Sequence, residues 1–142
     1  MPGEKRAFQI ISKAMNLPES VLLVEDEAHI RLMFRKVFEL MGIPDIREAK
    51  NGLEACNSYG ANPTDVVMMD INMPEMNGLD AMERILKADP EAIVIMLTSL
   101  STRNAVDTSL KAGATYFIRK DTPIVEMQAT LTEVFEKVFA TS

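Results

Sequence analysis

SVLLVEDE, residues 20–27, is an apolar run that ends in three acidic residues. Two further runs have the same form: Val66-Val67-Met68-Met69 leads into Asp70, and Tyr116-Phe117-Ile118-Arg119 leads into Lys120. Short apolar runs bounded by polar residues are typical of buried parallel strands. In an open α/β sheet, ligands bind beyond the carboxyl ends of the strands. We therefore expect these charges to meet in one crevice.

Strands and helices are predicted to alternate along the rest of the chain. Apolar residues at helical spacing predict five helices, over residues 30–41, 51–59, 78–88, 102–112 and 123–138. Two more short strands are expected, at 46–49 and 93–97. Five strands alternating with five helices predict an α/β fold with a doubly wound parallel sheet. Of the two common strand orders we expect 2-1-3-4-5, in which the first and third strands flank the point where the winding reverses.

The composition places limits on the function. The chain has 142 residues, 47% of them apolar and 25% charged, as in an ordinary soluble globular domain. A net charge of −6 argues against non-specific nucleic-acid binding. The single cysteine, Cys56, cannot form an internal disulfide and suggests a reducing compartment. No apolar stretch reaches the roughly 20 residues of a membrane span. We expect a cytoplasmic protein without membrane insertion.

The chain is predicted to have two parts. Residues 1–19 form an N-terminal extension, either a short helix with Phe8, Ile11 and Met15 on one face or a tail. Residues 20–142 form the α/β domain, without an internal repeat. We expect no further domain.

The expected crevice suits phosphoryl chemistry. The predicted strand order brings Glu25 and Asp26 beside Asp70, and carboxylates that are gathered in a small space repel one another unless a cation neutralises them. An all-oxygen cluster suits Mg²⁺. Asp70 is then both a metal ligand and a possible nucleophile, since carboxylates can form aspartyl phosphates. Lys120 and the hydroxyl of Thr98, at the end of the fourth strand, could contact phosphoryl oxygens.

With these residues in place, the sequence resembles a response regulator receiver domain of the stand-alone chemotaxis type. That family has a flavodoxin-like, CheY-like fold. Five motifs over roughly residues 20–139 carry the resemblance: Leu23-Val24-Glu25-Asp26-Glu27, Asp70-Ile71-Asn72-Met73-Pro74-Glu75-Met76-Asn77-Gly78, Leu97-Thr98-Ser99, Gly113-Ala114 and Lys120. The resemblance implies two-component signalling: Asp70 accepts a phosphoryl group from a histidine kinase or a histidine phosphotransfer protein. Glu25 and Asp26 would hold Mg²⁺ together with Asp70 and the backbone carbonyl of Asn72.

The resemblance also implies a conformational switch. Thr98 and Lys120 would bind the phosphoryl oxygens, and Phe117 falls at the switch aromatic. Output would go to a protein partner through a face that contains five residues: Arg103, Asn104, Asp107, Lys111 and Arg119. The resemblance implies that the protein is not an enzyme: the only reactions it carries out are its own phosphorylation and a slow autodephosphorylation.

Several alternatives remain open on the sequence alone. A phosphorelay intermediate, which passes the phosphoryl group on to another histidine, fits the sequence equally well. A binding module that no longer depends on phosphorylation also stays open, because Asp121 stands where many receivers have proline. We expect a trans peptide bond between Lys120 and Asp121. A phosphatase of the haloacid dehalogenase type would need an aspartate where Asn72 stands. Glu25 and Asp26 could instead cap the first helix. Thr98 could instead cap the helix predicted after it, over residues 102–112.

Overall fold

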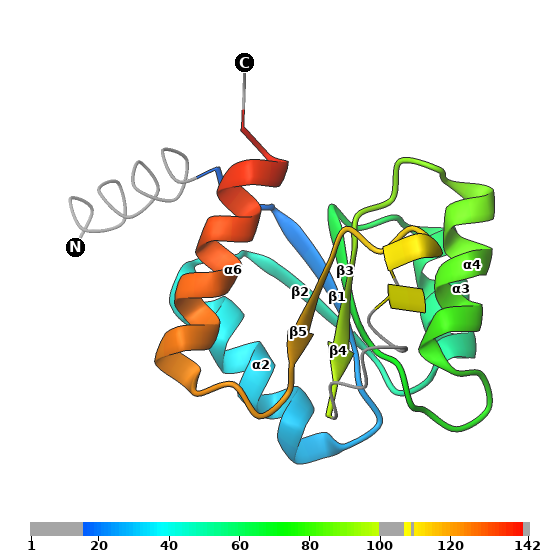
Figure 1. The fold of residues 1–142 in the computed structure, drawn as a ribbon, viewed down its shortest axis with the longest axis horizontal. Helices are drawn as coiled ribbons and strands as arrows, with labels where there is room; N and C mark the ends of the chain where they lie inside the picture. Colours follow the sequence, from blue (N-terminus) through cyan, green and yellow to red (C-terminus); the bar gives the residue numbers. More distant parts are fainter. Residues whose placement is uncertain (1–15, 100–106, 109, 141–142) are drawn as a thin grey trace.

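The computed structural model describes residues 16–99, 107–108 and 110–140. Within them, five parallel strands form one sheet in the order β2-β1-β3-β4-β5 (Figure 1). The strands are β1 (Ser20–Val24), β2 (Asp45–Ala49), β3 (Val66–Asp70), β4 (Val94–Thr98) and β5 (Tyr116–Arg119). The predicted fold class and strand order are confirmed.

Helices cover both faces of the sheet. Four are described: α2 (Ala28–Met41), α3 (Gly52–Ala61), α4 (Gly78–Ala88) and α6 (Ile124–Val138). Helices α2 and α6 lie on one side, and α3 and α4 lie on the other (Figure 1). The prediction of five helices is not matched, because the helix expected over 102–112 falls largely outside the described residues. Its last turn is seen where the Ala112 N–H donates to the Thr108 carbonyl at 2.9 Å. The predicted stripe of Phe8, Ile11 and Met15 also lies outside them.

The sheet divides the apolar core into two clusters. Successive side chains of a strand point to opposite faces. In β1, therefore, Val21 and Leu23 pack with α2 and α6, while Leu22 and Val24 pack with α3 and α4. All five side chains of β3 and of β4 are buried, which explains why these strands are almost continuously apolar in sequence. None of the described helices has the length and apolar content that a membrane span requires.

Two glycines fix the ends of helices near the sheet. Gly42 adopts a φ of 90° after α2, and its N–H donates to the Glu39 carbonyl, which ends the helix with a left-handed cap. Gly78 opens α4 directly behind β3, where a Cβ would collide with the Asp70 carbonyl oxygen. The Gly78 N–H donates to the Ile71 carbonyl at 2.8 Å. This close approach holds the chain that follows Asp70 against the end of the sheet.

Candidate functional site

The predicted site residues lie at the carboxyl ends of neighbouring strands. Glu25 directly follows β1, Asp70 and Thr98 are the last residues of β3 and β4, and Lys120 directly follows β5. Parallel pairing aligns these ends, with Val24 beside Met69 and Asp70 beside Leu97. Because the strands are in register, charges that are up to 95 positions apart in sequence meet in space.

Lys120 joins the two buried carboxylates. Its Nζ donates to Oδ2 of Asp70 at 2.8 Å and to Oε1 of Glu25 at 2.9 Å. Nζ also lies 2.8 Å from Glu25 Oε2, but the angles there do not fit a hydrogen bond, so this buried oxygen makes only an ion-pair contact. The side chains are 10% exposed for Lys120, 4% for Asp70 and 0% for Glu25. This ion-pair cluster is therefore almost fully shielded from solvent.

Burial dominates the ionisation of the two carboxyls. It raises the pKa of Glu25 to about 7, against the lowering effect of the Lys120 hydrogen bond and with a further raising effect from Asp70. Burial likewise raises the pKa of Asp70, although Lys120 and the Asn72 N–H, 3.3 Å from Asp70 Oδ1, both favour its charged form. Burial opposes the charge of Lys120, but its hydrogen bonds to Asp70 and Glu25 outweigh this effect and raise its pKa.

Asp26 completes a group of three carboxylates. Glu25, Asp26 and Asp70 each offer an oxygen, and these atoms all lie within 4.8 Å of one another. Asp26 is exposed while the other two are buried, so a cation held here could keep water on its open side. Oxygen donors at this spacing fit a hard divalent cation such as Mg²⁺. Asn72, whose backbone carbonyl is the fourth predicted ligand, lies two residues beyond Asp70 in the loop that follows β3, and its side chain is exposed.

The predicted switch residues lie on the next two strands. Thr98 is 3% exposed, and its backbone carbonyl accepts from the Lys120 N–H at 2.8 Å. Phe117 packs against the apolar core cluster on the α3 and α4 side of the sheet. Tyr116 is 42% exposed and lines a hollow of about 140 Å³ with residues of α6, on the opposite side of the strand. Thr98 is therefore bonded to the backbone of Lys120, and Phe117 is part of the packing on the α3 and α4 side.

Part of the predicted output face is described. Asp107, Lys111 and Arg119 are exposed, whereas Arg103 and Asn104 lie outside the described residues. Asp121, which stands where many receivers have proline, forms a two-point ion pair with Arg119 at 2.7 and 3.0 Å.

Two of the expectations about local geometry can be compared with the structure. The peptide bond between Lys120 and Asp121 is trans, as predicted. The N-cap of α2 is Glu27, which makes no side-chain capping bond, so neither Glu25 nor Asp26 caps this helix. The Glu27 N–H instead donates to Glu25 Oε1 at 3.2 Å. The alternative role for Thr98 concerns a helix start that lies outside the described residues.

Sequence reasoning missed one charged group next to the site. Nη1 of Arg31, on α2, donates to the backbone carbonyl of Glu25 at 2.8 Å, and its Nε donates to Glu48 of β2 at 2.8 Å. The arginine follows Glu25 by six positions and the glutamate lies 17 positions beyond it, so no local motif joins them. The only available signal was the place of Arg31 on the first predicted helix, between the first two predicted strands.

Comparisons with known proteins agree with this geometry. Residues 21–132 match the family model of the response regulator receiver domain. Chemotaxis protein CheY of Thermotoga maritima is 42% identical over 100 residues, which cover 70% of this chain and 83% of that protein. Chemotaxis protein CheY1 of Helicobacter pylori is 36% identical over 127 residues, which cover 86% and 98%.

A solved structure supports the same assignment. The chain resembles one in the crystal structure of a CheX–CheY complex with BeF3 and Mg²⁺ from Borrelia burgdorferi, with a TM-score of 0.78 and 30% identity. The match covers 88% of this chain and 92% of that one. The protein therefore belongs to the response regulator receiver domain family.

Proposed function

We propose that the chain is a response regulator that accepts a phosphoryl group on Asp70 from a phosphohistidine of a histidine kinase or phosphotransfer protein. The observation that carries this proposal is the contact of Asp70 with Lys120, at 2.8 Å, within a cluster of three carboxylates. The receiver domain runs from residue 20, and residues 1–19 are an extension to it. We place this signalling protein in the cytoplasm.

The residues have complementary roles in the transfer. An oxygen of the Asp70 carboxylate bonds to phosphorus as the P–N bond of the phosphohistidine breaks, and the electron pair of that bond stays on the departing imidazole nitrogen. Lys120, whose raised pKa keeps it protonated, then pairs with a phosphoryl oxygen. Thr98 donates its hydroxyl to another phosphoryl oxygen.

The three carboxylates and the backbone carbonyl of Asn72 would hold Mg²⁺. The donor set supports this assignment, because two buried and one exposed carboxylate leave a solvent side for retained water. When bound, Mg²⁺ neutralises charge on the phosphoryl oxygens during transfer. The Borrelia complex contains Mg²⁺ and BeF3, and we propose that both also bind to this chain.

Phosphorylation would shift a two-state equilibrium. A phosphoryl group that contacts Thr98 and Lys120 differently in the two states draws Thr98 inward, and Phe117 moves with it. The predicted output face, which consists of Arg103, Asn104, Asp107, Lys111 and Arg119, would then change its affinity for a protein partner.

Incubation with acetyl phosphate and Mg²⁺, followed by intact-mass spectrometry, tests this proposal. We expect the mass of one phosphoryl group to be added to the wild type and none to Asp70→Asn. Asp65→Asn, which changes an aspartate in the loop before β3, is the matched control and should be labelled normally. Equal labelling of wild type and Asp70→Asn would rule out the assignment, and no labelling of either would favour a phosphorylation-independent module.

A further inference from the structure

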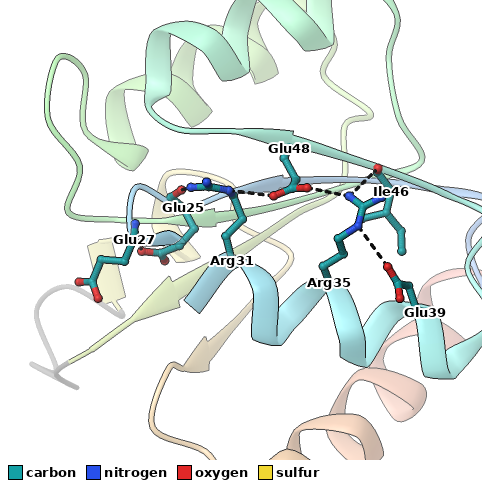
Figure 2. Close-up of polar contacts among 7 residues, drawn as sticks. All are labelled: Glu25, Glu27, Arg31, Arg35, Glu39, Ile46 and Glu48. Atoms are coloured by element: carbon teal, nitrogen blue, oxygen red, sulfur yellow. Dashed lines mark hydrogen bonds and ion pairs between the residues drawn. The ribbon is translucent and has the colours of Figure 1, made fainter. Parts of the chain in front are cut away.

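Two arginines of α2 share one glutamate of β2. Arg31 Nε donates to Glu48 Oε1 at 2.8 Å, and Arg35 Nη1 donates to Glu48 Oε2 at 2.7 Å (Figure 2). The arginines are four residues apart, so both side chains project from the same face of the helix. Figure 2 shows Glu48 between them. The glutamate therefore fixes the position of both guanidinium groups.

Each arginine also holds one backbone carbonyl, and the two carbonyls lie in different places. Arg35 Nη1 donates to the Ile46 carbonyl, within β2, at 3.2 Å. Arg31 Nη1 donates to the Glu25 carbonyl at 2.8 Å, in the loop that carries the acidic pair. The Arg31 side chain is 14% exposed and that of Arg35 is 35% exposed, so the contact of Arg31 is the better shielded from water.

The contact with Arg31 completes the anchoring of the Glu25 peptide units. On its other side, the Glu25 N–H donates to the Ala49 carbonyl at 3.1 Å. With both its N–H and its C=O engaged, the backbone at Glu25 has one orientation. That orientation directs the Glu25 side chain toward Lys120. It also fixes the backbone position of Asp26, the next residue.

We propose that Arg31, oriented by Glu48, is a positioning residue that holds Glu25 and Asp26 in the geometry for a divalent cation. This inference rests on the proposed function, since it concerns the same site. The planar guanidinium donates in two directions at once, to the carbonyl and to Glu48, which the single ammonium of lysine does with less fixed geometry. Partners that orient metal ligands typically change metal affinity by roughly 10–100-fold when they are removed.

Electrostatics alone predicts the opposite sign. A guanidinium beside the acidic pocket repels Mg²⁺, so a purely Coulombic role means that its removal tightens Mg²⁺ binding. A positioning role means that removal weakens Mg²⁺ binding, because the two carboxylates lose their fixed separation. The direction of the change therefore distinguishes the two roles.

The test compares Arg31→Met with the matched control Arg35→Met in the full chain. Both variants lose one positive charge and one contact with Glu48, but only Arg31→Met releases the Glu25 carbonyl. By isothermal titration calorimetry we expect Arg31→Met to raise the dissociation constant for Mg²⁺ about tenfold. Arg35→Met should stay within about twofold of the wild type, and Arg31→Lys should lie between them.

A second measurement requires no metal. Hydrogen exchange in EDTA should be faster at the amides of Asp26 and Glu27 in Arg31→Met, and unchanged in Arg35→Met. Mg²⁺ binding by Arg31→Met that equals or exceeds that of Arg35→Met would overturn the proposal. If Arg31→Met does not fold, Arg31→Lys takes its place, and an Mg²⁺ affinity of Arg31→Lys equal to that of the wild type would overturn the proposal. A wild type that neither binds Mg²⁺ nor is labelled on Asp70 would instead refute the proposed function.

Discussion

Replacing the buried Glu25 by glutamine tests whether the site is a source of instability. The pKa of Glu25 is about 7 in the folded protein, against 4.5 for an ordinary glutamate, chiefly because burial removes the carboxylate from water. At 1.36 kcal/mol per pKa unit, this difference corresponds to about 3 kcal/mol. The neutral amide resembles the protonated acid, and Lys120 keeps its bond to Asp70. At about pH 8 in EDTA we expect Glu25→Gln to raise the free energy of unfolding by up to about 3 kcal/mol, or roughly 10 °C in Tm.

The pH dependence follows from the direction of the shift. A carboxyl whose pKa is raised on folding binds its proton more tightly in the folded state, so wild-type stability falls as the pH rises from 4.5 to about 7. The raised pKa of Asp70 acts in the same direction, while Lys120 titrates above this window. The stability difference between Glu25→Gln and the wild type should therefore be small near pH 4.5 and grow toward pH 8.

Urea unfolding followed by circular dichroism, across this pH range and in EDTA, measures the effect. Glu133→Gln is the matched control, because Glu133 also pairs with a lysine, Lys137 at 3.3 Å, but on the exposed surface. The control should change the free energy of unfolding by less than about 0.5 kcal/mol at any pH. A Glu25→Gln protein that is less stable than the wild type at pH 8, by a margin that is lost as the pH falls through 4.5 and below, would show that the ion pair with Lys120 outweighs the cost of burial.

Three further predictions concern the same region. Mg²⁺ at ten times its dissociation constant should raise the free energy of unfolding of the wild type by about 1.4 kcal/mol, seen as a higher Tm in calorimetry; no shift would count against the acidic pocket as a cation site. Lys120→Met should slow labelling by acetyl phosphate by about 10²-fold, measured by intact mass over time, and unchanged kinetics would remove Lys120 from the transfer. Gly78→Ala should destabilise the fold by at least about 2 kcal/mol in urea unfolding, because its Cβ would meet the Asp70 carbonyl. Gly60→Ala is the control, because Gly60 lies inside α3 with open space around it, and this change should stabilise the fold by about 0.5–1 kcal/mol. Similar effects of the two substitutions would contradict the close approach at Gly78.

The architecture was predictable because its signals are local. The strands of the sheet centre are buried on both faces, so their sequences are nearly continuous apolar runs between polar residues. The boundaries were less certain: the fourth strand was predicted over 93–97 with Thr98 at its end, and β4 runs from Val94 to Thr98. A hydroxyl residue at a strand end carries no sign of whether its backbone still pairs.

The site was predictable at its strand ends and not beyond them. Glu25, Asp70 and Lys120 follow from one rule about parallel sheets. The contact of Arg31 with the Glu25 carbonyl depends on how α2 lies against β1 and on where Glu48 falls in β2. Those are properties of packing, and a solvated surface arginine has the same sequence pattern.

The bridge that Lys120 makes between Glu25 and Asp70 means that the chain supplies a tethered counter-ion of its own. An incoming cation must compete with this ammonium for the carboxylates, and an incoming phosphoryl group must compete with the carboxylates for the ammonium, so occupation of the pocket is an exchange of partners. The net affinity is then the difference between two well-satisfied arrangements. Such a difference is smaller than the energy of either arrangement alone, which suits a signal that must be erased.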